Sequence, residues 1–245
     1  MTKVYEALEN AKTEVFHGAS KISPIRPGAT ISPSASSRVV MAKEIRVYQT
    51  LASIIPDSTR KVIQFIGSRE GEGTSTIVRE FARVSSAKFG KSVLILDADQ
   101  HRPRQHLFFH ILPDCGWQEV VRDHQPIEKA LHQIGGTRLF VSPSSEYSPS
   151  HPHNYNSLLI DAFLTKLRER FDLILIDSPP ATTSTDGLTI SSKVDGVVLV
   201  VEAEKTRWPV AESVRDKIKR SGGSILGIVL NKRRFHIPDW VYKKL

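Results

Sequence analysis

Residues 61–76 read KVIQFIGSREGEGTST, which is an apolar run, then a glycine-rich turn, then a hydroxyl-rich stretch that begins a helical pattern. A strand predicted over Val62–Ile66 would lead into the turn. Gly71 and Gly73 would allow backbone N–H groups to face an anion, and the helix that follows would direct the positive end of its dipole toward it. The stretch therefore predicts a loop that binds the phosphates of a nucleotide.

The predicted loop departs from the usual phosphate-binding motif at one position. The motif ends in Gly-Lys-Ser/Thr, whereas here Thr74 stands between Gly73 and Ser75. Ser75 keeps a hydroxyl for Mg²⁺ and Thr76 one for the phosphates, but Thr74 brings no positive charge. Losing one charge-assisted hydrogen bond costs about 1.5–3 kcal/mol, so we expect weakened binding and still weaker phosphoryl transfer. Arg69 could supply the missing charge, although we favour a role as a solvated loop residue. The alternative interpretation of the whole stretch is a glycine-rich turn that binds no ligand.

Length and composition limit the classes of protein that the chain can belong to. Its 245 residues, of which 40% are hydrophobic, suffice for one sizeable α/β domain with tails. There is no run of about 20 apolar residues, and the first residues are polar and charged, so a cytoplasmic location is expected. The net charge of +8 favours an anionic partner. Cys115, as the single cysteine, excludes an internal disulfide, and His101, His106 and His110 lack partners at metal-ligand spacing.

Composition also divides the chain into parts. Apolar residues spaced by three and four near the start predict a short amphipathic helix, and the prolines and serines that follow predict a flexible linker. A further helix is expected over residues 39–55, where the globular domain would begin. The parts are an N-terminal helix (1–15), a linker (16–38), a domain like that of P-loop NTPases (39–236) and a basic, aromatic tail (237–245).

Apolar runs that are typical of buried parallel strands alternate with helical patterns along the domain. This alternation predicts an α/β fold with a mostly parallel central sheet and helices on both faces. Beyond Val62–Ile66, strands are expected at 93–96, 139–142, 173–177, 197–201 and 225–230, and helices at 75–88, 117–122, 127–134, 158–170 and 209–221.

Two of the predicted strands end in aspartate. In SVLILDADQHRP (92–103) the apolar run is followed by Asp97 and Asp99, and in FDLILIDSPP (171–180) it ends at Asp177. Ligands of open parallel sheets bind at the carboxyl ends of the strands, so these carboxylates would hold Mg²⁺ or take a proton from an attacking hydroxyl. The alternative is that the aspartates only form turns.

The order of these motifs resembles that of the cytoplasmic domains of bacterial tyrosine kinases (BY-kinases), which serve polysaccharide export and belong with MinD, ParA and Mrp to the deviant P-loop group. The resemblance covers nearly the whole chain. Its motifs are KVYEAL (3–8), SREGEGTST (68–76), VLILDADQHRP (93–103) as the second Walker motif, FDLILIDSPP (171–180) as Walker B, VVLVVEAEKTR (197–207) and LGIVLNKRRF (226–235).

The resemblance implies a role for each candidate site residue, with ATP or ADP and Mg²⁺ as cofactors. The catalytic residues would be Asp97, Asp99 and Asp177, and the metal would be held by Ser75, Asp97 and Asp177. The nucleotide would be bound by Gly71, Glu72, Gly73, Thr74, Ser75, Thr76 and Asn231, the last of these at the adenine edge.

Three departures from the family pattern point to a regulatory pseudokinase. Thr74 replaces the lysine that contacts the phosphates. The oligomerisation motif Glu-x-x-Arg-x-x-Arg reads Lys43, Arg46 and Gln49 here, so homo-oligomerisation stays open, and the tyrosine-rich tail is reduced to Tyr242. An abandoned site would not need to retain all of its aspartates, which argues for a remaining metal site.

The favoured function is that of a BY-kinase-like nucleotide-binding protein of exopolysaccharide biosynthesis and export, either regulatory or a weakly active kinase or ATPase. It would work beside a membrane polysaccharide co-polymerase or chain-length protein, and would be cytoplasmic or peripheral at the inner membrane. A non-catalytic adaptor that binds no nucleotide is one alternative. The other is a positioning ATPase like ParA or MinD that binds DNA or lipid, for which the terminal stretch 240–245 is short.

Overall fold

The computed structural model describes residues 61–144 and 157–232. The expected N-terminal helix, the linker, the helix at 39–55, the oligomerisation motif and the C-terminal tail with Tyr242 lie outside the described residues. Among the helices that are described, none has the length and apolar character needed to cross a membrane.

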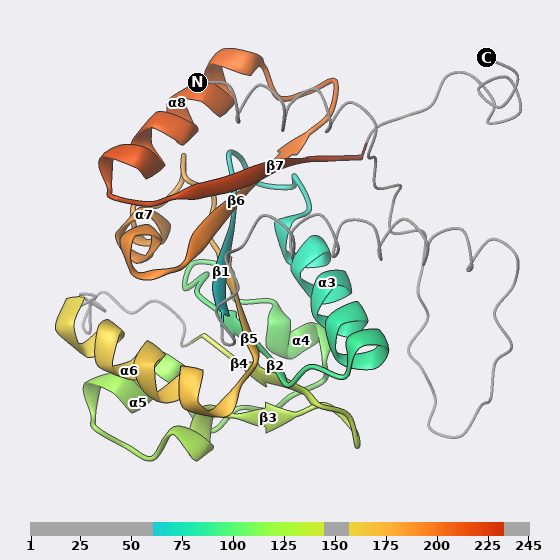
Figure 1. Cartoon of the computed structure of the whole chain (residues 1–245), viewed down its shortest axis with the longest axis vertical. Coiled ribbons are helices and arrows are strands. Elements are labelled where there is room, and N and C mark those ends of the chain that lie inside the picture. The colour runs from blue at the N-terminus through green and yellow to red at the C-terminus, as the bar shows by residue number, and fades with distance from the viewer. Residues whose placement is uncertain (1–60, 145–156, 233–245) are drawn as a thin grey trace, which may run out of the picture.

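The core is a seven-stranded sheet with the order β3-β4-β2-β5-β1-β6-β7 (Figure 1). Neighbouring strands pair in parallel, except that β3 and β4 are antiparallel. The carboxyl ends of the parallel strands therefore meet at one edge, where the predicted site residues fall. The strands are β1 (Lys61–Gly67), β2 (Val93–Asp97), β3 (His132–Gln133), β4 (Leu139–Ser142), β5 (Leu173–Ser178), β6 (Gly196–Glu202) and β7 (Ile225–Asn231).

Helices cover both faces of this sheet, as Figure 1 shows for α3 on one side and α6 on the other. The arrangement confirms the predicted α/β fold. The helices are α3 (Thr74–Phe89), α4 (Gln105–Phe108), α5 (Trp117–Arg122), α6 (Ser157–Arg170), α7 (Asp186–Ile190) and α8 (Trp208–Arg220), with short 3₁₀ turns η2 (Ile127–Ala130) and η3 (Ser191–Lys193).

Alternation along the central strand β1 explains the two layers. Ile63 and Phe65 pack toward α3, and the ring of Phe65 lies 5.8 Å from that of Phe81. Val62 and Ile66 pack on the opposite face. Since successive side chains of a strand point to opposite faces, a strand buried on both sides must be apolar at nearly every position.

The expected helix over 127–134 is wrong. The chain instead forms η2 and then β3, where His132 pairs with Val141 of β4. β3 supplies backbone partners along an otherwise unpaired edge of β4, and such a long-range ladder leaves no trace in local periodicity. The short helices α4 and α7 were not predicted, whereas the other predicted strands and helices within the described residues are confirmed to within one residue at either end.

Candidate nucleotide-binding site

The loop between β1 and α3 has the backbone shape that the sequence predicts for it. Gly71 and Gly73 have φ angles of 80° and 90°, a region that favours glycine. At Gly73 space is also limiting, because an added Cβ would lie 2.3 Å from Nδ2 of Asn231. Gly73 is the N-cap of α3, and the first turn of a helix leaves backbone N–H groups without intrahelical partners. The loop thus leads into a helix end suited to an anion.

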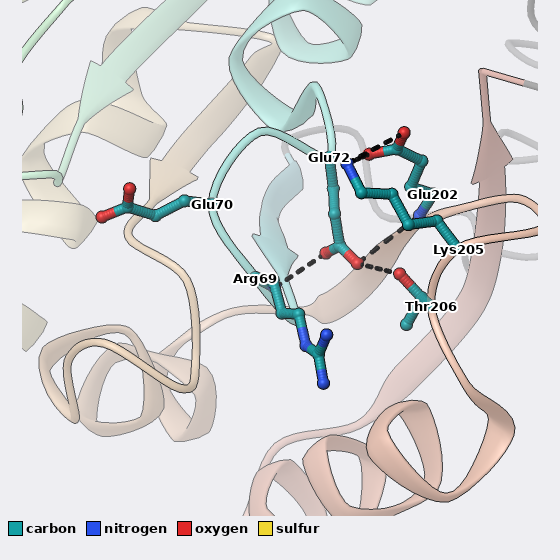
Figure 2. Close-up of a pocket in the computed structure, with 6 residues that line it drawn as sticks. All are labelled: Arg69, Glu70, Glu72, Glu202, Lys205 and Thr206. Carbon is teal, nitrogen blue, oxygen red and sulfur yellow. Dashed lines mark hydrogen bonds and ion pairs between the residues drawn. The ribbon is translucent and has the colours of Figure 1, made fainter.

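Glu72 is buried inside the loop, and its side chain holds the loop together. Its carboxylate accepts hydrogen bonds from the backbone N–H of Ser68 (2.6 Å) and of Arg69 (2.9 Å). It also accepts from the hydroxyls of Ser68 (2.7 Å) and Thr206, so it joins the loop to the segment that follows β6 (Figure 2). The carboxylate is therefore occupied by contacts within the chain. If Glu72 contacts nucleotide as predicted, its backbone makes the contact.

The end of β7 supports the loop from another side. Asn231 donates from Nδ2 to the carbonyl of Glu72 at 2.7 Å and accepts through Oδ1 from the N–H of Lys232 at 2.9 Å. The ammonium of Lys232 donates to the carbonyl of Gly71 and lies 3.3 Å from the carboxylate of Glu202. Asn231 thus braces the loop, and its predicted place at the adenine edge stays a prediction.

A small hollow lies beside the loop, lined by Arg69, Glu70, Glu72, Glu202, Lys205 and Thr206. Figure 2 shows the side chains of Arg69 and Glu70 leaving the loop in different directions. Arg69 is exposed, and Glu70 forms an ion pair of 2.6 Å with Arg102. These placements agree with Arg69 as a solvated loop residue.

The two aspartates that are predicted to hold the metal lie at or next to the ends of neighbouring strands. Asp97 at the end of β2 lies directly opposite Asp177 in β5, and both side chains are buried. The carboxylate of Asp97 accepts hydrogen bonds from the backbone N–H of Asp99 (3.1 Å), Arg104 (3.2 Å) and Gln105 (3.1 Å). Asp97 therefore shapes the loop after β2 in addition to facing Asp177.

Gln105 connects the two carboxylates. It is fully buried, and while its N–H donates to Asp97, its Nε2 donates to Asp177 at 2.7 Å. The indole of Trp117 donates to the backbone carbonyl of Asp97 at 2.6 Å. Sequence reasoning missed Gln105 and Trp117, because neither belongs to a motif and both reach the site only through the folded loop.

Asp99 lies at the rim of this cluster and is half-buried. Its carboxylate accepts hydrogen bonds from the backbone N–H of His101 at 3.1 Å and of Arg102 at 3.0 Å. The structure thus gives Asp99 a local turn-forming contact, and its predicted catalytic role stays a prediction.

Burial controls the pKa values of the paired carboxyls. It raises the pKa of Asp177 to about 6, against the opposing effects of hydrogen bonds from Gln105 and Ser75 and of the nearby Arg79. Burial, together with the charge of Asp177, also raises the pKa of Asp97 well above its ordinary value. Two buried carboxyls side by side resist carrying two negative charges, so a cation bound between them is favoured.

The oxygen atoms of Ser75, Asp97 and Asp177 fit Mg²⁺, a hard cation that uses one or two protein carboxylates together with phosphate oxygens and water. Ser75 is the second residue of α3, and its hydroxyl hydrogen-bonds to the carboxylate of Asp177. Across the described ranges, no group of three or more His, Cys, Asp or Glu side chains could hold a metal alone. Ser75, Asp97 and Asp177 would fill part of the coordination shell of Mg²⁺, and water or phosphate oxygens would fill the rest.

Comparison with known proteins places the chain in a family, although no protein-family model matches it. It is 31% identical over 177 residues to the tyrosine-protein kinase CpsD of Streptococcus agalactiae, covering 70% of this chain and 75% of that protein. The chain belongs to the bacterial tyrosine-protein kinase family. Another member, the tyrosine-protein kinase YwqD of Bacillus subtilis, is 26% identical over 192 residues, covering 78% of this chain and 80% of that one.

Solved structures agree with this membership. The chimerical protein CapA2B2 superimposes with a TM-score of 0.72 and 25% identity over 79% of this chain and 85% of that one. The septum site-determining protein MinD of Pyrococcus horikoshii, complexed with Mg-ADP, has a TM-score of 0.61 and 20% identity over 76% of each chain, which shows the shared fold.

Within this bacterial tyrosine kinase fold, Thr74 does not replace the charge of a lysine. Its hydroxyl turns back toward the end of β1, since a Cβ added at Gly67 would lie 2.8 Å from Thr74 Oγ1. The backbone and hydroxyls of a phosphate-binding loop are therefore retained, while a positive side chain at position 74 is missing.

Glu72→Ala should destabilise the protein more than Glu70→Ala does. Removing the buried carboxylate leaves the N–H groups of Ser68 and Arg69 without this acceptor, which costs about 2–3 kcal/mol of unfolding free energy. Glu70 is exposed on the same loop, so its removal should cost less than about 1 kcal/mol. Urea unfolding followed by circular dichroism measures both, and equal costs would contradict the role given to Glu72.

Asp177→Asn should stabilise the metal-free protein at neutral pH and not at acid pH. Because the pKa of Asp177 is about 6 in the folded state and about 4 in the unfolded chain, wild-type stability falls as the pH rises through that interval. The asparagine cannot ionise, so its advantage should grow from near zero at about pH 4 to about 1–3 kcal/mol above pH 6.5. Urea unfolding in EDTA across this range measures the difference, and a difference independent of pH would reject the raised pKa.

Proposed function

We propose that this protein binds ADP or ATP with Mg²⁺ at the loop 67–76 and acts as a regulatory or weakly active member of its family. The observation that carries the proposal is the joint retention of the loop and of the Asp97–Asp177 pair at one edge of the sheet. A chain that had lost its ligand would have no need to keep two buried, mutually repelling carboxyls beside a preformed anion site.

The binding residues follow from the positions described above. The backbone of Gly71, Glu72, Gly73 and Thr74 would surround the phosphates, with the hydroxyl of Thr76 beside them. Ser75, Asp97 and Asp177 would hold Mg²⁺, which when bound neutralises phosphate charge. If a tyrosine hydroxyl is phosphorylated, we assign its proton to Asp97, because this carboxyl ends β2 on the side of the sheet where the phosphates would lie.

Titration calorimetry with ADP and Mg²⁺ tests this proposal. Wild-type protein should bind, and Thr74→Lys should bind about tenfold more tightly, because one charge-assisted hydrogen bond contributes about 1.5–3 kcal/mol. Thr165→Lys is the matched control, since it adds the same charge at an exposed position on α6 and should bind as wild type does. If no variant binds ADP at millimolar concentration, the protein is a non-catalytic adaptor.

We further propose that the protein acts in exopolysaccharide biosynthesis, in the cytoplasm or peripherally at the inner membrane, beside a membrane polysaccharide co-polymerase. Family membership and the resemblance of the motifs support this role.

In cells, Asp177→Ala should reduce polysaccharide output severalfold, while Asp123→Ala, an exposed control, should not. Unchanged output from Asp177→Ala at normal protein levels would instead favour the adaptor. A positioning ATPase would be favoured by a different pair of results. Polysaccharide output would depend neither on this protein nor on the co-polymerase, and the purified protein would bind DNA or vesicles in a salt-sensitive way.

A further inference from the structure

Arg79 is a basic side chain that reaches the carboxylate side of the site. It lies on α3, three residues after Thr76 and therefore on the same helix face. Its Nη2 donates to Thr76 Oγ1 at 3.2 Å and its Nη1 to Gln105 Oε1 at 3.5 Å. The guanidinium carbon lies 4.2 Å from the centroid of the Phe108 ring. Three neutral groups, two of them hydrogen-bond acceptors, thus fix the guanidinium in place.

The charge of Arg79 is not consumed by a direct partner. Within the described ranges, none of the ion pairs includes Arg79. Arg83, one turn further along α3, is instead exposed and paired with Glu80 at 2.7 Å. Burial lowers the pKa of Arg79 while Asp177 and other nearby carboxylates raise it. An arginine remains protonated under such conditions, so the site contains a permanent positive charge.

Gln105 transmits this charge to the carboxylates. Its side-chain oxygen faces Arg79 and its nitrogen faces Asp177, so its amide dipole is aligned between a cation and an anion. Chains of hydrogen bonds polarise one another in a low-dielectric interior. Arg79 and the Asp97–Asp177 pair are therefore one electrostatic unit.

We propose that Arg79 is a built-in cation of the nucleotide site, which offsets the Asp97–Asp177 pair and provides positive charge that position 74 lacks. The inference rests on the proposed nucleotide binding. It has two opposite consequences. The fixed charge repels a divalent cation from the carboxylates in the empty protein, and it lessens the repulsion between those carboxylates and the phosphates of a nucleotide when no metal is present.

The first test is Mn²⁺ binding to the nucleotide-free protein, followed by electron paramagnetic resonance. Arg79→Gln should bind Mn²⁺ at least about tenfold more tightly than wild type, because it removes a unit charge close to the carboxylates. Arg79→Lys keeps the charge, and Arg83→Gln removes an exposed charge from the same helix, so both should match wild type. The proposal is overturned if Arg79→Gln and Arg83→Gln bind Mn²⁺ with equal affinity. It is also overturned if neither variant binds Mn²⁺ detectably.

The second test compares ADP binding in EDTA and in Mg²⁺. For each protein, the dissociation constant of ADP in EDTA is divided by the dissociation constant in Mg²⁺. This ratio should be small for wild type and at least about tenfold larger for Arg79→Gln. An unchanged ratio overturns the role of Arg79 alone, whereas no ADP binding by wild type rejects the proposed function and leaves the Mn²⁺ comparison to judge Arg79. Thermal unfolding checks that each variant is folded. If Arg79→Gln is not, Arg79→Met removes the charge while keeping an apolar stem against Phe108.

Discussion

The buried carboxylate of Glu72 is the interaction on which the site depends most. It accepts from two backbone N–H groups and two hydroxyls of the loop and its neighbour, and Asn231 holds the carbonyl of the same residue. Through Glu72 the ends of β1, β6 and β7 are tied together. A buried charge is tolerated only when it is satisfied in this way, so the loop holds its shape through contacts within the chain. Such preorganisation lowers the cost of binding an anion.

Charge at the site is distributed differently from the family pattern that the sequence resembles. Thr74 brings none to the loop, while Asp97 and Asp177 concentrate negative charge beneath it. Arg79 lies on the helix that begins at the loop and acts on those carboxylates through Gln105. Under the proposed function, the site would hold phosphates with less stabilisation of the charge that develops during transfer, as expected of a protein whose bound nucleotide is a signal rather than a substrate.

The sequence predicted the features that depend on local pattern. Strands such as β1 and β5 are mostly apolar because both of their faces are buried, and Gly71 and Gly73 mark the turn because only glycine accepts its backbone angles easily. The carboxyl-end rule placed Asp97 and Asp177 together, which the register confirms.

Features that depend on contacts distant in sequence were not predictable. The segment 127–134 has a helical pattern, but the open edge of β4 draws part of it into the sheet. Glu72 looked like a loop residue available to a ligand, and only the fold shows that Ser68 and Thr206 surround it. Arg79 and Gln105 have no motif around them. They are in contact only because the fold brings α3 and α4 together near the carboxyl ends of the strands.

Hydrogen–deuterium exchange of the backbone amides from Gly71 to Thr76, measured with and without saturating ADP and Mg²⁺, would show whether this loop binds the phosphates of the nucleotide. These N–H groups form the expected phosphate cradle, and several lie at a helix start where intrahelical partners are lacking. If the loop binds phosphate, ADP should slow their exchange several-fold while amides in β4, at the far side of the sheet, exchange as before. Unchanged exchange across 71–76 under conditions where ADP is bound elsewhere on the protein would contradict phosphate binding at this loop.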